Sequence, residues 1–166
     1  MGVKRRRSYE TGHRPKFMVV IDETPECGRA LHFAARRAAR TGADLLMLAV
    51  VTPPDEFEWI GVGEAMREEA EEEARERLEK AGADARADAG VDPQTAIRTG
   101  EKAEAIVAQI EEDEDVSFLV LAAGSGKEGP GPLVTAIAGK AASTFPIPVV
   151  IVPGGLSDEE IDALAG

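Results

Sequence analysis

The chain has 166 residues, of which 31 are acidic and 19 basic, so its formal net charge is −12 at pH 7. This length suits one domain with a sizeable core, and the negative charge disfavours nucleic acid phosphates and anionic membrane surfaces, so we expect no nucleic acid partner. The sequence has one cysteine, no secretory signal and no apolar run of membrane-spanning length, which predicts a cytoplasmic protein that does not bind membranes.

The first 14 residues are polar and carry the basic cluster Lys4-Arg5-Arg6-Arg7 before any apolar periodicity begins. We predict that residues 1–14 form a mobile basic arm, that residues 15–153 form a single domain, and that residues 154–166 form a C-terminal tail. In the tail, Ser157 followed three residues later by Glu160 has the form of a capping box, which predicts a short helix over residues 158–164.

Five short apolar runs alternate with segments that have apolar residues at helical spacing. The runs predict strands over residues 17–21, 45–51, 95–98, 117–123 and 148–152, with the weak run 95–98 near a sheet edge. The helical segments cover about 24–41, 64–81, 103–110 and 134–145, the first capped by Thr24 and stopped by Gly42. This alternation predicts a three-layer α/β fold on an open parallel sheet.

Two loops stand out at the expected carboxyl ends of these strands. Phe57, Trp59 and Ile60 follow Pro53-Pro54, and they either form a lid over a ligand or cover the end of the core. The second loop is rich in glycine and links the fourth strand to the last core helix. Glycine allows the backbone to approach a phosphate there, and Lys127 adds a positive charge. Its candidate residues are Gly124, Ser125, Gly126, Lys127 and Gly129.

The end of the first predicted strand carries the polar residues Asp22, Glu23 and Thr24. Because strand ends gather on one rim of a parallel sheet, these residues are expected to lie near the glycine loop. An aspartate in this place can accept hydrogen bonds from a ribose or an adenine amine. The two loops together predict a nucleotide site.

Several catalytic and metal sites are excluded by spacing. The Gly126-Lys127 pair lacks the earlier glycine and the following Ser or Thr of a Walker A loop, and the Gly-x-Gly-x-x-Gly spacing that begins at Gly124 follows the fourth strand instead of the first. Two histidines and one cysteine do not suffice to predict a metal site, and no histidine lies in sequence reach of Ser125. We therefore predict neither catalytic residues nor metal ligands.

Five segments in this order resemble the universal stress protein family over residues 16–153. They are residues 19–31, 46–51, 99–106, 119–126 and 145–152. The resemblance implies a flavodoxin-like, adenine-nucleotide-hydrolase-like sheet of five strands in the order 3-2-1-4-5. It also implies a homodimer paired through the Pro148–Val152 strand, and no established catalytic turnover beyond slow ATP hydrolysis.

Nucleotide-binding members of that family have an Asp after the first strand, an adenine contact after the second and a glycine motif after the fourth. By resemblance, Asp22 matches the Asp, Val50 the adenine contact and Gly124 the first glycine of the motif. Thr135-Ala136 stand where the family has Gly-Ser, and Gly126 comes one residue earlier than the family's second glycine. The match implies ATP, accompanied by Mg²⁺, as the ligand.

Three functions follow as hypotheses. The first is an ATP- or adenine-nucleotide-binding sensor that regulates a stress response. The second is a dimeric family member that binds no nucleotide and meets an unknown protein partner through the Trp59 loop, the acidic surface or the basic arm. The third, a phosphoacceptor receiver domain, is suggested by Asp22-Glu23 but lacks the aspartate after the third strand and the lysine after the fifth that it needs.

Overall fold

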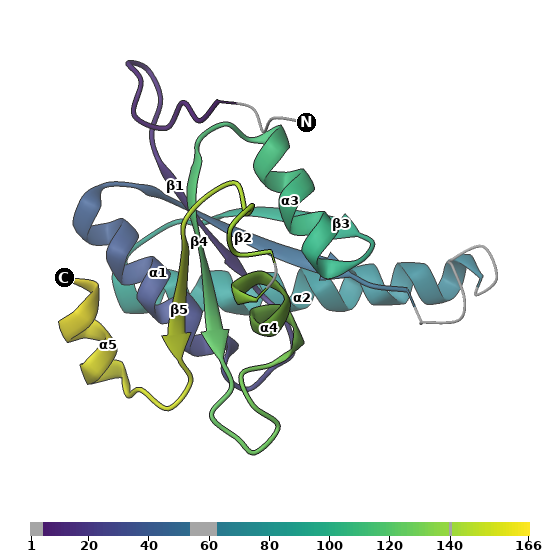
Figure 1. Ribbon diagram of the computed structural model, residues 1–166. Coiled ribbons are helices and arrows are strands. Elements are labelled where there is room, and N and C mark those ends of the chain that lie inside the picture. Colours follow the sequence, from purple (N-terminus) through teal and green to yellow (C-terminus); the bar gives the residue numbers. More distant parts are fainter. Residues whose placement is uncertain (1–4, 54–62, 140) are drawn as a thin grey trace.

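The computed structural model describes residues 5–53, 63–139 and 141–166. Within these ranges five parallel strands form one sheet in the order β3-β2-β1-β4-β5, which confirms the predicted sheet (Figure 1). The edge position of the weak third run is also confirmed. The strands are β1 (Lys16–Val20), β2 (Asp44–Val51), β3 (Gln94–Thr99), β4 (Val116–Ala123) and β5 (Val149–Pro153).

Helices cover both faces of the sheet, which gives the three predicted layers. On one face lie α1 (Cys27–Thr41) and α2 (Glu64–Ala89), and α5 (Asp158–Ala165) packs beside α1. On the other face lie α3 (Lys102–Glu112) and α4 (Pro132–Ala138). Because all five strands are parallel, their carboxyl ends point to one rim of the sheet, where the glycine loop leaves β4 (Figure 1).

The central strand β1 is buried on both faces because side chains alternate along it. Phe17 and Val19 pack in the cluster with α1 and α2, whereas Met18 and Val20 pack in the cluster with α3 and α4. Val19 also pairs in register with Val120 of β4. A continuous apolar run in the sequence thus marks a strand with two covered faces.

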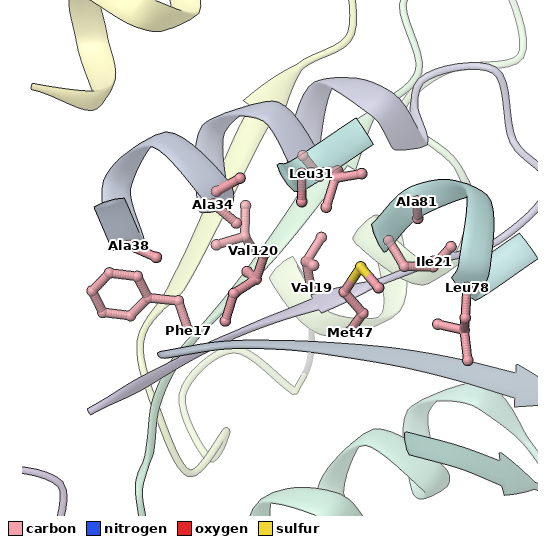
Figure 2. Close-up of a cluster of buried hydrophobic side chains, with 14 of the residues drawn as sticks. Phe17, Val19, Ile21, Leu31, Ala34, Ala38, Met47, Leu78, Ala81 and Val120 are labelled. Carbon is pink, nitrogen blue, oxygen red and sulfur yellow. The ribbon is translucent and has the colours of Figure 1, made fainter. Parts of the chain in front are cut away.

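Small residues let α1 approach the sheet closely. Ala34 and Ala38 lie over Phe17 and Val120, with Leu31 one turn away on the same side of the helix (Figure 2). Burying a side chain such as that of Leu31 stabilises the fold by about 1.5–3 kcal/mol. The helix ends at Thr41 and is stopped by Gly42, as predicted. Gly42 has a φ of 74°, which favours glycine.

The carboxyl-terminal ends of two helices differ most from the prediction. Helix α2 continues to Ala89 instead of ending at Ala81, because Gly82 and Ala85 keep its small buried face in contact with the sheet. Helix α4 begins at Pro132 and ends at Ala138, so the predicted continuation to residue 145 is wrong. Its stop is Gly139, whose φ of −87° and ψ of −120° leave the helical region.

The two predicted helix caps have opposite outcomes. Thr24 does not cap α1, because its N–H and its hydroxyl both donate to the Asp22 carboxylate, and the N-cap residue is Glu26. The capping box of Ser157 and Glu160 is confirmed at the start of α5, which spans Asp158–Ala165. The reciprocal hydrogen bonds of Ser157 and Glu160 were thus predictable from the sequence. The hydrogen bonds from Thr24 to Asp22, which replace the helix cap, were not.

The described part of the predicted arm lies against the α3–β4 connection. The Arg7 N–H donates to the Glu114 carbonyl at 2.9 Å, and the Arg6 guanidinium donates to the carbonyls of Ile110 and Asp113 at 2.7 and 3.0 Å. These bonds attach residues 6 and 7 to that connection, and the mobility of the arm over residues 1–14 stays a prediction. Phe57, Trp59 and Ile60, predicted as a lid or core cover, lie outside the described residues.

Candidate ligand-binding site

A wide hollow of about 770 Å³ opens at the carboxyl ends of β2 and β3. This volume lies within the range of about 300–1,000 Å³ that is usual for small-molecule sites. Its walls come from the end of β2, the start of α3, one face of α4 and one side of α2. Its lining includes Val50, Thr52, Lys102, Ala103, Leu133 and Ala136.

A narrow hollow of about 80 Å³ adjoins the wide one at the ends of β1 and β4. The two share Lys102, Pro132 and Leu133, so they are two ends of one cleft. Asp22 and Glu26 line the narrow end. The cleft therefore runs along the rim that the sequence predicted, with unequal space at its two ends.

Asp22 lies where β1 ends, and its carboxylate is already engaged. One oxygen, Oδ1, accepts from the N–H and hydroxyl of Thr24 at 3.0 and 2.6 Å. The other, Oδ2, lies 3.5 Å from the Lys102 ammonium. The Asp22 side chain is only 15% exposed, so these groups fix its orientation. Asp22 lines the narrow end beside Lys102, which lines both ends of the cleft.

Lys102 is a residue of the cleft that the sequence analysis missed. It is the first residue of α3, directly after Glu101, whose carboxylate caps the helix by accepting the N–H groups of Ala103 and Glu104 at 3.0 and 2.9 Å. A cation at a helix N-terminus is unfavourable toward the helix dipole. That unusual placement, next to a strand end, was the available signal in the sequence.

The third residue of the predicted strand-end cluster, Glu23, faces the wide hollow and is mostly exposed. Its carboxylate lies 3.9 Å from the Arg77 guanidinium of α2, which lines the same wall. This pair at the cleft rim is weak because its Glu23 side is 76% exposed. Arg77 was another residue that the sequence analysis did not single out.

The glycine loop bends back onto itself. The Gly124 N–H donates to the Pro130 carbonyl at 3.0 Å, and the Gly129 N–H donates to the Gly126 carbonyl at 3.2 Å. Gly129 has a φ of 84°, a conformation that favours glycine. Ser125, Gly126 and Lys127 are exposed and line neither end of the cleft. The loop thus uses two of its amides internally.

Thr135 and Ala136, predicted at the start of the last core helix, are instead its fourth and fifth residues. Helix α4 begins at Pro132, and the Thr135 hydroxyl donates to the Gly131 carbonyl at 2.8 Å. Thr135 lines neither end of the cleft, whereas Ala136 lines the wide end. The residues at the helix start are Gly131, with a φ of 106°, and Pro132, which has no N–H to donate.

Cys27 forms part of the wall of the narrow end but is not a reactive thiol. Its Sγ lies 3.5 Å from both the Asp22 N–H and the Val20 carbonyl. Burial, opposed in part by the backbone hydrogen bond from Asp22, raises the pKa of the Cys27 thiol to about 11. At neutral pH the thiol is protonated and acts as a small apolar group.

Carboxylates outnumber cations around the cleft. Among the described residues its walls carry five acidic side chains, those of Asp22, Glu23, Glu26, Glu73 and Glu101, and two basic ones, those of Arg77 and Lys102. Such a lining attracts neutral or cationic ligands more than polyanions. Val50, Ala74, Leu133 and Ala136 supply apolar surface beside these charges.

Over the described ranges, no group of three or more His, Cys, Asp or Glu side chains is arranged to hold a metal ion. In the same ranges, none of the helices has the length and apolar character needed to cross a membrane. A groove of about 560 Å³ between α2 and β3 is lined by Met47, Gly82 and Ile97 and contains none of the predicted site residues.

Comparisons with known proteins agree with this architecture. A model of the universal stress protein family matches residues 13–153. The universal stress protein UspA from Lactobacillus plantarum superposes with a TM-score of 0.69 at 16% identity, over 83% of this chain and 97% of that one. No curated protein matches this chain significantly in sequence.

Two other solved structures of this family contain nucleotides. The universal stress protein from Archaeoglobus fulgidus, in complex with dAMP, has a TM-score of 0.59 at 17% identity, over 83% of this chain and 97% of that one. A universal stress protein in complex with cAMP has a TM-score of 0.50 at 20% identity, over 85% and 98% of the two chains. At these identities the likeness establishes a common fold.

Proposed function

The chain belongs to the universal stress protein family, and on that premise we propose that it is a sensor that binds the adenosine part of an adenine nucleotide in the wide end of the cleft. The observation that carries this proposal is the wide hollow at the ends of β2 and β3, with Val50 and Leu133 as apolar walls beside Asp22. Two structural neighbours were solved with dAMP and cAMP, which supports the choice of ligand class.

The residues present suit an adenine base and a ribose. Val50, Val51 and Leu133 supply apolar surface for a flat ring, and the β2 end places its backbone along the same wall. Asp22 offers carboxylate oxygens for the ribose hydroxyls, as predicted from the sequence. Lys102 and Thr24 hold that carboxylate in place, so their role is to position Asp22.

The proposed function involves binding and assigns no catalytic residue. Within the described residues, side chains around the proposed adenosine position are held by their neighbours, since Asp22 contacts Thr24 and Lys102, and Glu23 contacts Arg77. A site of this kind suits binding without reaction, as a sensor requires. We therefore propose that ligand occupancy is the signal that the protein reports in the stress response.

Filling the wide hollow with a side chain tests the proposal. Ala136 is exposed on α4 and lines the hollow, so Ala136→Trp should place an indole in the ligand's space without disturbing the core. We expect calorimetric titration with AMP to show binding to the unmodified chain and at least a tenfold weaker affinity in this variant. The matched control is Ala138→Trp, because Ala138 is also exposed on α4 but does not line the cleft.

Absence of AMP and adenosine binding to the unmodified chain would overturn the proposal. The hypothesis of a dimeric module that recognises a protein partner without nucleotide would then stand in its place. Equal affinity in the Ala136→Trp and Ala138→Trp variants would instead move the ligand to another surface.

We also propose that the protein is a homodimer paired through β5. This strand is bonded to β4 on one side only and forms one edge of the sheet. Ile151, in the middle of β5, is 38% exposed. An open apolar edge of this kind favours pairing with another strand. Light scattering after size exclusion should give twice the mass of 17.6 kDa, and Ile151→Lys should shift the protein toward monomer.

A further inference from the structure

The narrow end of the cleft differs from what a nucleotide triphosphate needs. The sequence predicted that backbone amides of the glycine loop and the start of the last core helix would bind the phosphates of ATP. In the structure three separate features close that place to phosphate: the side chain of Glu26, the internal bonding of the loop, and the start of α4.

Glu26 occupies the space beside Gly124. A Cβ built on Gly124 would lie 3.2 Å from Glu26 Oε1 and 3.0 Å from the Gly129 carbonyl oxygen. The bare backbone of Gly124 therefore makes room for a carboxylate and a carbonyl of this chain. Both are hydrogen-bond acceptors, as is a phosphate oxygen, so neither can bind one.

The Glu26 carboxylate is not neutralised in this position. Within the described residues it accepts no hydrogen bond and forms no ion pair, whereas nearby Asp22 is paired with Lys102 at 3.5 Å. An unpaired carboxylate at the place predicted for phosphate repels each negative charge that a ligand brings.

Two loop amides and the first position of α4 cannot offset this repulsion. The amides of Gly124 and Gly129 donate to the Pro130 and Gly126 carbonyls at 3.0 and 3.2 Å. Pro132, the first residue of α4, has no N–H, and α4 has only seven residues. The hollow beside them measures about 80 Å³, far below the usual size of a ligand site.

From these observations we infer that the cleft selects a nucleoside such as adenosine over ATP, with affinity falling as phosphates are added. The inference rests on the proposed adenosine site and specifies the ligand class for it. It replaces the expectation of ATP with Mg²⁺, because the residues at the narrow end do not fit a triphosphate. Lys102 is placed to lessen the cost of a first phosphate, since it lines both ends of the cleft.

The test is a calorimetric series with adenosine, AMP, ADP and ATP, each without Mg²⁺ and again with it. We expect adenosine to bind at least about tenfold more tightly than ATP, with AMP between them, because like charges across a binding surface are costly. Glu26→Gln should raise ATP affinity several-fold and leave adenosine within about twofold. Glu159→Gln, an equal charge change at an exposed residue of α5, should alter neither.

The outcomes separate the inference from the function on which it rests. Tightest binding by ATP would overturn the inference and leave the adenosine site standing. Equal affinity for all four ligands would overturn it as well, because charge at the narrow end would then have no effect. If none of the four binds, the proposed function fails and the inference fails with it.

Discussion

The two ends of the cleft are formed at the same rim of the sheet, yet only one is open. At the wide end, α2, α3 and α4 stand apart from the β2 end and leave about 770 Å³. At the narrow end, the glycine loop folds back and Glu26 fills the space beside Gly124, so only about 80 Å³ remains. The fold brings the strand ends together at one rim, but the sequence of the loops that follow the strands determines how much space for a ligand remains there.

Tight packing at the narrow end predicts the largest effect on stability. A Cβ added at Gly154 would lie 2.5 Å from the Ala123 carbonyl oxygen and 3.1 Å from Glu26 Cβ. We expect Gly154→Ala to lower the free energy of unfolding by about 1–3 kcal/mol, because the backbone must shift to relieve the overlap.

Urea denaturation measures this loss, and the neighbouring glycine is its control. At Gly155 an added Cβ meets only Ser125 Cβ at 3.9 Å, an ordinary contact. Gly155→Ala should therefore be nearly neutral. Equal free energies of unfolding for the two variants would show that the backbone around Gly154 is not tightly packed.

Removing the charge at the boundary between the two ends should have a smaller effect, and that effect should be on ligand affinity. Lys102→Met removes the cation that both ends share. Both ligands lose a group that positions Asp22, but only AMP also loses an attracting charge, so we expect AMP affinity to fall about three- to tenfold more than adenosine affinity. Titrations of both ligands with the variant measure the split.

Lys127 provides the control for that prediction. The sequence analysis proposed this lysine for phosphate, but it is exposed on the glycine loop and lines neither end of the cleft. Lys127→Met should leave both affinities unchanged. A larger loss of AMP affinity in Lys127→Met than in Lys102→Met would show that the glycine loop contributes to the binding site.

The smallest effect is expected far from both ends, where α5 is attached to α1. The Arg36 guanidinium donates to Asp162 Oδ1 at 2.7 Å, and His32 Nε2 lies 2.7 Å from the same oxygen. The hydrogen bond from Arg36, with that from His32, lowers the pKa of Asp162 to about 2. Stability from this lowered pKa is present at neutral pH and is lost as the pH falls from about 4 through 2.

Asp162→Asn should accordingly lower the melting temperature by a few degrees at pH 7, with the difference from the unmodified chain shrinking as the pH falls through that window. Adenosine affinity at pH 7 should not change, because α5 does not line the cleft. A difference in melting temperature that is the same at pH 7 and pH 2.5 would show that the carboxylate charge is not its cause.

The sheet was predictable because its signals are local and redundant. An apolar run such as residues 17–21 indicates a strand covered on both faces, and the alternation of five runs with helical segments indicates an open parallel sheet. The strand order came from the family resemblance. The capping box of α5 was equally local. Thr24 shows the limit of such reasoning, since its hydroxyl had two possible partners and bonds Asp22 instead of the helix backbone.

The site was only partly predictable because its features depend on residues far apart in sequence. Asp22, Val50 and Ala136 line the cleft, and their contact with a ligand stays a prediction. The closure of the narrow end depends on Glu26 meeting Gly124, which no spacing along the chain reveals. Lys102 was missed because a lone lysine at a helix start has no motif around it.

The most direct test of the adenosine site is a nuclear magnetic resonance titration of the isotope-labelled protein with adenosine. We predict the largest amide shift changes at the wide end, at Val51, Thr52 and Ala103, and small changes at Gly124 and Gly129, whose amides are bonded within the loop. Changes confined to the groove between α2 and β3, or no changes at millimolar adenosine, would contradict the account.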